Sequence, residues 1–218
     1  EYRRLVRRVR AGDLEARARE YRSTMCLEWV LTGSLLLLWL NANRPIDLLG
    51  FALPGGRSLV LGSAVTILGL SFLYAQWRTL TRLDSTGLQK LRAQMESVAD
   101  FLPRTPKEAA LFRYLSITAG ICEEILFRGY LIWYLGAFMG AWAGAAVAGV
   151  AFGALHAYQG RAGAVRTGLV GLGMGALYVG TGSLLWPMIL HTAIDVQGGA
   201  VGRRVLAPAT AAAEPAPA

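Results

Sequence analysis

The chain contains about six stretches of predominantly apolar residues, each long enough to cross a lipid bilayer as a helix. Their approximate ranges are 24–40, 59–77, 111–138, 140–158, 164–180 and 184–201. Apolar residues make up 54% of the 218 residues and charged residues only 17%, which excludes a disordered chain and is unusual for a soluble domain. With 2 Cys the chain is not a disulfide scaffold. The sequence therefore predicts an all-α, polytopic membrane helix bundle of about six transmembrane helices.

The positive charge of the chain supports this arrangement independently. The net charge is +8, from 22 Lys and Arg against 14 Asp and Glu. Nearly all the basic residues fall on one side of the predicted membrane, whereas the other side has Arg44 and Arg57 alone. Because short cytoplasmic loops are enriched in Lys and Arg, we expect both termini on the cytoplasmic side of a membrane, such as the prokaryotic cytoplasmic membrane. The expected partner of this charge is the lipid bilayer, and no nucleic-acid partner is expected.

Composition divides the chain into three parts. Residues 1–23 form a basic cytoplasmic or interfacial arm, residues 24–205 a transmembrane domain, and residues 206–218 an Ala/Pro-rich tail that we expect to be disordered. In the second loop, apolar residues recur every three or four positions and predict an amphipathic helix lying on the membrane: Leu88, Leu91, Met95, Val98 and Leu102. Glycine pairs four residues apart predict close packing of the fourth and fifth helices.

Six ionisable side chains lie inside the last four apolar stretches. They are Glu123, Glu124, Arg128, His156, His191 and Asp195. Each charged residue near the centre of a membrane helix costs about 2.5–3.5 kcal/mol, so the four other than histidine together cost roughly 10–14 kcal/mol. That sum is comparable with the whole stability of a typical domain, about 5–15 kcal/mol. Such a set of residues indicates a functional site.

The spacing of these residues favours particular pairs. Glu124 and Arg128 are four residues apart and can pair on one helix face, as can His191 and Asp195. Glu123 is rotated by about 100° from Glu124, so its carboxylate can point into a cavity.

Two kinds of chemistry fit a carboxylate surrounded by imidazoles. Glu123 can act as a general base on water, with an imidazole moving the proton and another donor stabilising the oxyanion. Alternatively, Glu123, His156 and His191 can hold a zinc ion that activates the water. Both indicate hydrolysis inside a membrane.

Three motifs on successive helices resemble those of the CPBP family, the CAAX-protease and bacteriocin-processing intramembrane proteases, also called the Abi family. The family's EExxxR motif matches residues 123–128, its FxxxH motif matches 152–156, and its HxxxN or HxxxD motif matches 191–195. The motif-bearing core extends over about 111–199. The resemblance implies a glutamate-dependent intramembrane endopeptidase whose substrate is a membrane-associated protein or peptide, for example a prenylated CAAX-type or a C-terminally anchored one.

The resemblance also implies a role for each residue. Glu123 would activate the water with help from His156, and His191 with Asp195 would surround the oxyanion. An ionised Asp195 cannot itself donate to an oxyanion, so it would have to be protonated, orient His191 or bind a metal.

Glu124, Arg128 and Phe152 are expected to support the site structurally, with the ion pair between the first two holding Glu123 in place. No cofactor is expected to be required and no metal is assigned, with zinc as the alternative. The competing interpretation of the chain is a non-proteolytic membrane protein, either an immunity or scaffold factor or a proton-coupled carrier.

The expected helix ends raise a geometric problem. Glu123 lies near the middle of its stretch, whereas His156 lies close to the cytoplasmic end of the next. We therefore expect the third helix to begin later, or the fourth to extend further, than hydropathy indicates.

Overall fold

The computed structural model describes residues 2–206, and within them the regular structure is entirely helical. The all-α prediction is confirmed. The elements are α1 (Tyr2–Arg10), α2 (Ala16–Asn41), η1 (Ile46–Leu49), α3 (Gly56–Thr81), α4 (Ser85–Gln94), η2 (Glu96–Val98), α5 (Pro106–Glu124), η3 (Ile125–Leu131), α6 (Ile132–Met139), α7 (Ala141–Leu155), η4 (Ala157–Gln159), α8 (Gly160–Thr181) and α9 (Leu185–Leu206). The predicted Ala/Pro-rich tail lies outside the described residues, apart from residue 206.

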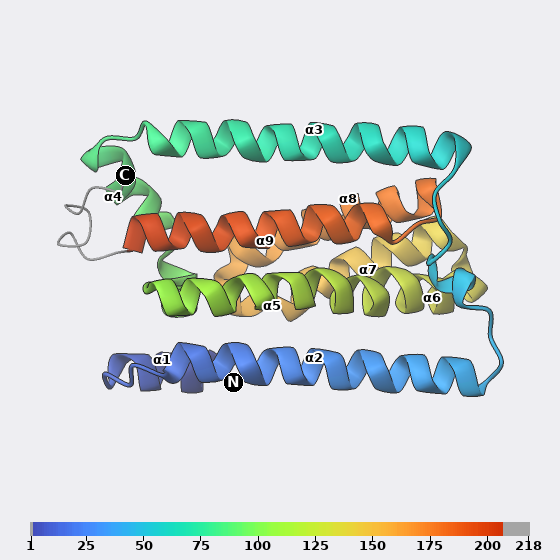
Figure 1. Ribbon diagram of the computed structural model, residues 1–218, viewed down its shortest axis with the longest axis horizontal. Coiled ribbons are helices and arrows are strands. Elements are labelled where there is room, and N and C mark those ends of the chain that lie inside the picture. Colours follow the sequence, from blue (N-terminus) through green and yellow to red (C-terminus); the bar gives the residue numbers. More distant parts are fainter. Residues whose placement is uncertain (1, 207–218) are drawn as a thin grey trace.

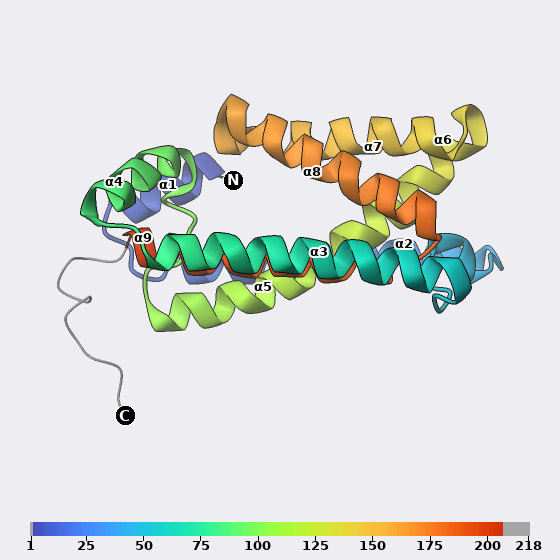
Figure 2. The ribbon, with the colours of Figure 1, turned by 90° about the horizontal axis from the view of Figure 1, so that it is seen from above.

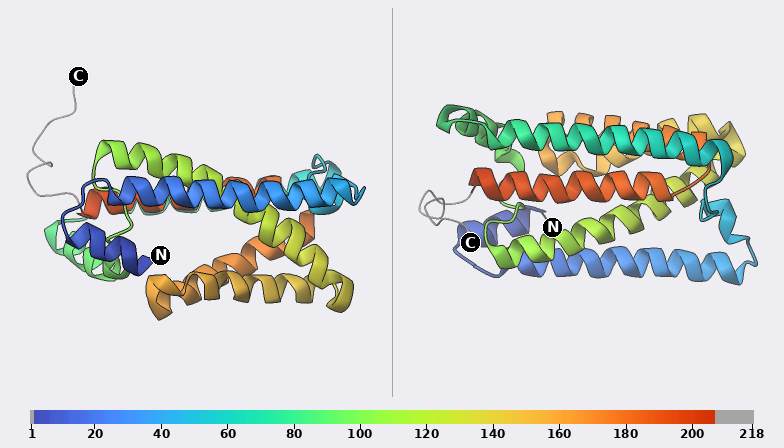
Figure 3. Two further views of the ribbon diagram at one scale, coloured as in Figure 1. Left: turned by 90° about the horizontal axis from the view of Figure 1, so that it is seen from below. Right: turned by 45° about the horizontal axis from the view of Figure 1, so that its top comes forward.

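The long helices form two layers. In the first layer α3, α9, α5 and α2 lie side by side in that order (Figure 1). Helices α6 and α7 form the second layer, which lies above the first in Figure 2. Helix α8 begins beside α7 and slants from the second layer toward the first. The short helices α1 and α4 lie together at one end of the bundle, the end at which α5 begins and α9 finishes (Figure 3).

Three helical segments are long and apolar enough to cross a membrane. They are Ala16–Asn41, Gly56–Thr81 and Ala157–Thr181, with mean hydropathies of 1.5, 1.8 and 1.3. The other predicted stretches also form helices, and Ala141–Leu155 is apolar but shorter. Helices α5 and α9 carry several charged residues each, because they bear the ionisable groups singled out in the sequence. The structure thus supports an integral membrane protein with three candidate spans.

A capping box fixes the start of α5 and joins it to α2. The Thr105 hydroxyl accepts a hydrogen bond from the Glu108 backbone N–H, while the Glu108 carboxylate accepts one from the Thr105 N–H. Pro106 occupies the first turn, where its missing N–H costs nothing. The other oxygen of Glu108 lies 3.4 Å from Nη1 of Arg17 on α2. This buried pair aligns the two helices that carry acidic residues into the same cavity.

The amphipathic helix of the second loop is confirmed, but its apolar face does not lie on the membrane. The helix consists of α4 and η2, and its apolar residues pack against the bundle beside Leu80, Phe112 and Leu206. The residues concerned are Leu88, Leu91, Met95 and Val98. The expectation of a lipid-facing surface is wrong because the ends of α3, α5 and α9 offer apolar side chains to the same face.

Small residues let α7 and α8 approach closely. A Cβ atom built on Gly153 would lie 2.7 Å from the carbonyl oxygen of Ala164 and 2.8 Å from Cα of Gly168. One on Gly171 would meet the Phe152 ring at 3.2 Å. The predicted packing role of these glycines is therefore confirmed, and it holds Phe152 against α8.

Substituting Gly153→Ala should destabilise the bundle, because the methyl group would contact backbone atoms that cannot rotate away. We expect a loss of about 1–3 kcal/mol, measured as a lower midpoint of thermal unfolding in detergent. Gly173→Ala is the matched control, since a Cβ at Gly173 on α8 has no neighbour within 4 Å. Equal midpoints for the two variants would contradict this account of the α7–α8 contact.

Candidate active site

A cavity of about 420 Å³ lies between the two layers and brings the sequence-predicted residues together. Its wall includes Glu123 from α5, His156 after α7, and both His191 and Asp195 from α9. Two of the predicted supporting residues, Arg128 and Phe152, also line it. Residues from all three motifs, which are far apart in the sequence, therefore line one cavity.

Glu124 and Arg128 form a buried ion pair behind this wall. Nη1 of Arg128 donates to Oε1 of Glu124 at 2.7 Å, and the two side chains are 2% and 0% exposed. The guanidinium also donates to the carbonyl oxygen of Gly171 on α8 at 3.3 Å, and it lies 4.5 Å from the centre of the Phe152 ring. A single side chain thus contacts three helical segments.

Arg128 lies in η3, a π-helical segment that continues α5. A π-helix has a wider turn than an α-helix and often occurs at functional sites. The wider turn lies directly after the motif that carries Glu123 and Glu124. It also marks the change of direction between α5 in one layer and α6 in the other (Figure 2).

The ring of His191 is oriented by the same carboxylate. Nδ1 of His191 lies 2.7 Å from Oε1 of Glu124, so Nδ1 carries the proton and donates to the carboxylate. Nε2 is thereby turned toward the cavity, 3.7 Å from Oε2 of Glu123 and 3.7 Å from Oδ2 of Asp195. The resemblance implied that Glu124 holds Glu123, and the geometry adds that Glu124 sets the orientation of His191.

Glu123 lines the cavity and has a carboxylate oxygen without a partner within residues 2–206. Its side chain is 19% exposed, and its Oε2 atom is buried without a hydrogen-bond partner in the described residues. The 3.7 Å to His191 is too long for a direct hydrogen bond. Because a carboxylate oxygen without a partner readily accepts a hydrogen bond from water, this atom is suited to act as a base.

His156 reaches the cavity from the C-terminal end of α7. Its Nδ1 lies 2.8 Å from the carbonyl oxygen of Phe152, which leaves Nε2 as the free ring nitrogen. The Phe152 ring stands between the two imidazoles, 4.6 Å from His156 and 5.8 Å from His191 between centroids. Among the described residues no hydrogen bond joins His156 to Glu123, so water or substrate has to connect them.

The helix ends expected from this geometry are wrong. Helix α5 begins at Pro106, earlier than residue 111, because the capping box precedes the apolar stretch. Helix α7 ends at Leu155, earlier than residue 158. His156 shares the cavity with Glu123 nevertheless, because the two layers meet around it and Phe152 fills the intervening space.

One residue of the cavity wall was missed by the sequence reasoning. Glu28 on α2 lines the same cavity, is 9% exposed, and has a buried Oε2 atom without a hydrogen-bond partner in the described part of the chain. The signal was present, because Glu28 is the single charged residue of the apolar stretch 24–40. Glu28 lies in the first stretch, away from the last four, which hold the other ionisable residues of the site.

A metal ion would need a different arrangement. Within residues 2–206, no group of three or more His, Cys, Asp or Glu side chains is placed to hold one. Nδ1 of His191 is bonded to Glu124 and Nδ1 of His156 to a backbone carbonyl. The zinc alternative therefore lacks a preformed ligand set in this structure.

The fold and the cavity define a class of protein: a helical membrane protein with a buried carboxylate and oriented histidines between its helices. Residues 105–197 match the family described as type II CAAX prenyl endopeptidase Rce1-like. This segment is somewhat under half of the chain and contains all three motifs, so the resemblance stated from the motifs is confirmed over these residues. Neither a curated protein nor a solved structure matches the chain.

Replacing Arg128 should destabilise the protein strongly, because Glu124 would keep a buried charge without its partner. We expect Arg128→Met to cost about 3–5 kcal/mol and to lower the thermal midpoint. Arg128→Lys should fall between it and the wild type, since an ammonium keeps the charge but loses the planar contacts to Gly171 and Phe152. Arg78→Met is the control at an exposed cation, with an expected effect within about 0.5 kcal/mol. A small loss for Arg128→Met would contradict the importance of the pair.

Proposed function

We propose that this chain is an intramembrane endopeptidase that hydrolyses a peptide bond in a membrane-associated protein or peptide by means of a glutamate-activated water. The observation that carries the proposal is the Glu123 side chain, which lines the cavity and has an unbonded Oε2 atom 3.7 Å from Nε2 of the oriented His191 imidazole. The match of residues 105–197 to the Rce1-like family supports the same reaction class.

The proposed reaction begins with water placed between Glu123 and the free Nε2 atom of His156. Glu123 takes a proton from this water, His156 accepts its second hydrogen bond, and the hydroxide adds to the carbonyl carbon of the scissile bond. The oxyanion that forms receives a hydrogen bond from Nε2 of His191 in its protonated form. Glu123 then returns the proton to the leaving nitrogen, the C–N bond breaks, and an acid and an amine are released.

In this scheme the supporting residues orient and stabilise the two imidazoles. Glu124, held by Arg128, fixes the His191 ring so that Nε2 faces the substrate. Asp195, with Oδ2 3.7 Å from that nitrogen, stabilises the positive charge of the imidazolium and does not itself donate to the oxyanion. Phe152 keeps the two imidazoles apart through ring contacts with both.

The walls of the cavity favour an apolar substrate. Around the acidic centre they carry Phe101, Leu102, Phe112, Leu115 and Val170. A lipidated or membrane-inserted segment can cover such side chains and bring its own apolar surface out of water. Prenylated CAAX-type and C-terminally anchored proteins or peptides both satisfy this requirement.

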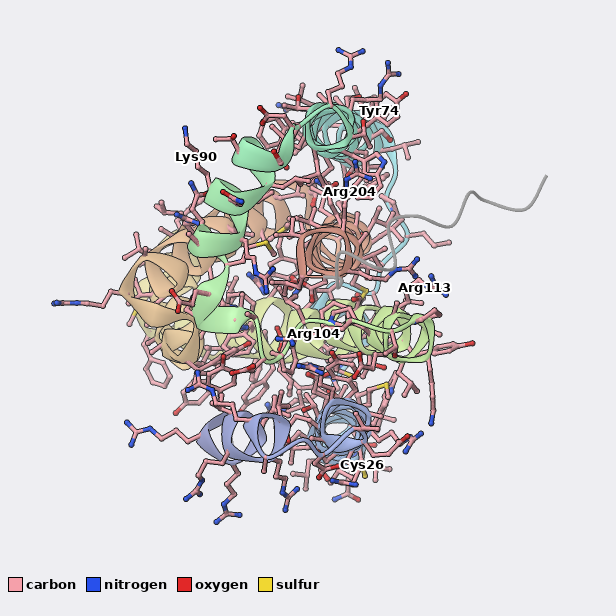
Figure 4. All side chains as sticks on the ribbon, turned by 90° about the vertical axis from the view of Figure 1, so that its left-hand side faces the viewer. Cys26, Tyr74, Lys90, Arg104, Arg113 and Arg204 are labelled. Atoms are coloured by element: carbon pink, nitrogen blue, oxygen red, sulfur yellow. The ribbon has the colours of Figure 1, made fainter. Side chains whose placement is uncertain are left out.

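We further propose six crossings of the membrane with both termini on the cytoplasmic side. Lys90, Arg104 and Arg204 lie at the end of the bundle that also holds α1 and α4 (Figure 4). The opposite end carries few basic residues, among them Arg44 beside Trp39 and Trp133. The positive-inside rule then assigns the basic end to the cytoplasm, such as that of a prokaryotic cell.

Glu123→Gln should abolish cleavage while leaving the protein folded, because an amide is nearly isosteric but cannot take a proton from water. We expect a loss of about 10²–10⁴-fold, and about 10²–10³-fold for His191→Ala. The measurement is mass spectrometry of peptide fragments from membranes that contain wild-type or variant protein. Glu96→Gln, at an exposed position outside the active-site cavity, is the control for loss of one negative charge.

Retention of the fragments in Glu123→Gln would refute the assignment of the base. If wild-type protein yields no fragments, and neutralising Glu123 instead abolishes proton-coupled transport or a protective effect, the chain is a carrier or an immunity factor.

Hydrolysis should not depend on a metal ion. Chelation with 1,10-phenanthroline is expected to leave the cleavage rate unchanged, and elemental analysis of the purified protein should find no stoichiometric zinc. Loss of activity on chelation and its return with zinc would instead assign the free nitrogens of His156 and His191, with Glu123, as ligands.

A further inference from the structure

Glu28 is a buried acidic group that the proposed reaction does not use. It lies on α2, a helix outside the segment matched by the family, and its side chain lines the active-site cavity. Thr24, one turn earlier, lines the cavity from the same helix. A carboxyl group that is nine-tenths buried without a hydrogen-bond partner is costly in a protein and more so within a membrane.

The charge around Glu28 is unbalanced. The charged groups that act on it are Glu123, Asp195 and His191, so two of its three charged neighbours are acidic. The buried cation of the site, Arg128, already forms its ion pair with Glu124. Arg166 also lines the cavity, but it lies on α8 in the other layer and is exposed. The described residues thus provide more acidic groups around this part of the cavity than cations to pair with them.

We propose that Glu28 forms a subsite that binds a cationic group of the substrate, a Lys ammonium or an Arg guanidinium, close to the scissile bond. This inference rests on the proposed peptidase function for its substrate. The cation supplies the hydrogen bond that Oε2 of Glu28 lacks, and its charge offsets the neighbouring carboxylates.

The position of the cavity agrees with such a substrate. Its wall includes Met95 and Val98 from the short helices at the basic end of the bundle, and Thr24 near the start of α2. Membrane-associated segments commonly carry Lys or Arg where they leave the membrane on the cytoplasmic side, with the aliphatic part of the side chain on apolar surface. The apolar walls fit the membrane-associated part of the substrate, and Glu28 fits the flanking cation.

The subsite is tested with two fluorescent apolar peptides that are identical except for one Lys in place of norleucine. Their binding to purified full-length protein is measured by anisotropy in nanodiscs of zwitterionic lipid, which do not themselves attract the cation. We expect the wild type to bind the Lys peptide about tenfold more tightly than the norleucine peptide. In Glu28→Gln this ratio should fall to about one, because the amide provides no charge.

Glu96→Gln is the matched control, because it removes the same charge from an exposed position on η2 outside this cavity. It should keep the wild-type ratio. A thermal unfolding midpoint for each variant separates loss of the subsite from loss of the fold. Glu28→Asp, which keeps the charge, should retain most of the preference.

Cleavage of the same peptides separates this inference from the proposed function. A Glu28-dependent preference in binding without any cleavage would support the subsite and count against the peptidase. Cleavage of both peptides without a Lys preference, or a preference that Glu28→Gln leaves intact, would overturn the subsite and leave the peptidase standing. Failure of the wild type to bind either peptide would also overturn the subsite.

Discussion

The Glu124 carboxylate accepts hydrogen bonds from both Arg128 and His191 through the same oxygen, and the arrangement of the site depends on this bifurcated contact. Arg128 extends the contact to the Gly171 carbonyl on α8 and to the Phe152 ring on α7. His191 extends it to α9. One carboxylate from α5 is therefore linked through two partners to both layers of the bundle. A charge so deeply buried is tolerated because its partners are fixed and bonded.

Several local features of the helices enclose the contact between Glu124, Arg128 and His191. The π-helical turn at 125–131 carries Arg128, and the capping box at Thr105 determines where α5 begins. The close approach of α7 and α8 at Gly153 keeps Phe152 against the guanidinium. These features are local, yet together they leave the other carboxylate of the motif, that of Glu123, in the wall of the cavity.

Much of this arrangement could be predicted from the sequence, and what was missed has physical causes. The apolar stretches predict the all-α fold. The shared site is predicted by charged residues inside these stretches, where a charge is energetically costly. The ends of α5 and α7 were not predictable from hydropathy, because a capping box outside the apolar stretch and the turn at His156 determine them. The face of α4 was misread because an apolar face on a helix does not reveal whether lipid or protein covers it. Glu28 was missed because, unlike the motif residues, it stands alone in its stretch.

The acidic residues at the site differ in position and in their partners, and these differences distinguish the residue that supports the site from those that can react or bind a ligand. Glu124 binds Arg128 and His191 through Oε1, and its Oε2 has no partner in the described part of the chain. Its side chain is fully buried and does not line the cavity, so it can orient His191 but does not meet a substrate there. Glu123 and Glu28 also have a carboxylate oxygen without a partner, but both side chains line the cavity, so each can accept a donor that enters it. Water is the donor that the reaction requires at Glu123. At Glu28, on the neighbouring helix α2, the proposed donor is a cation of the substrate, which offsets the excess of negative charge.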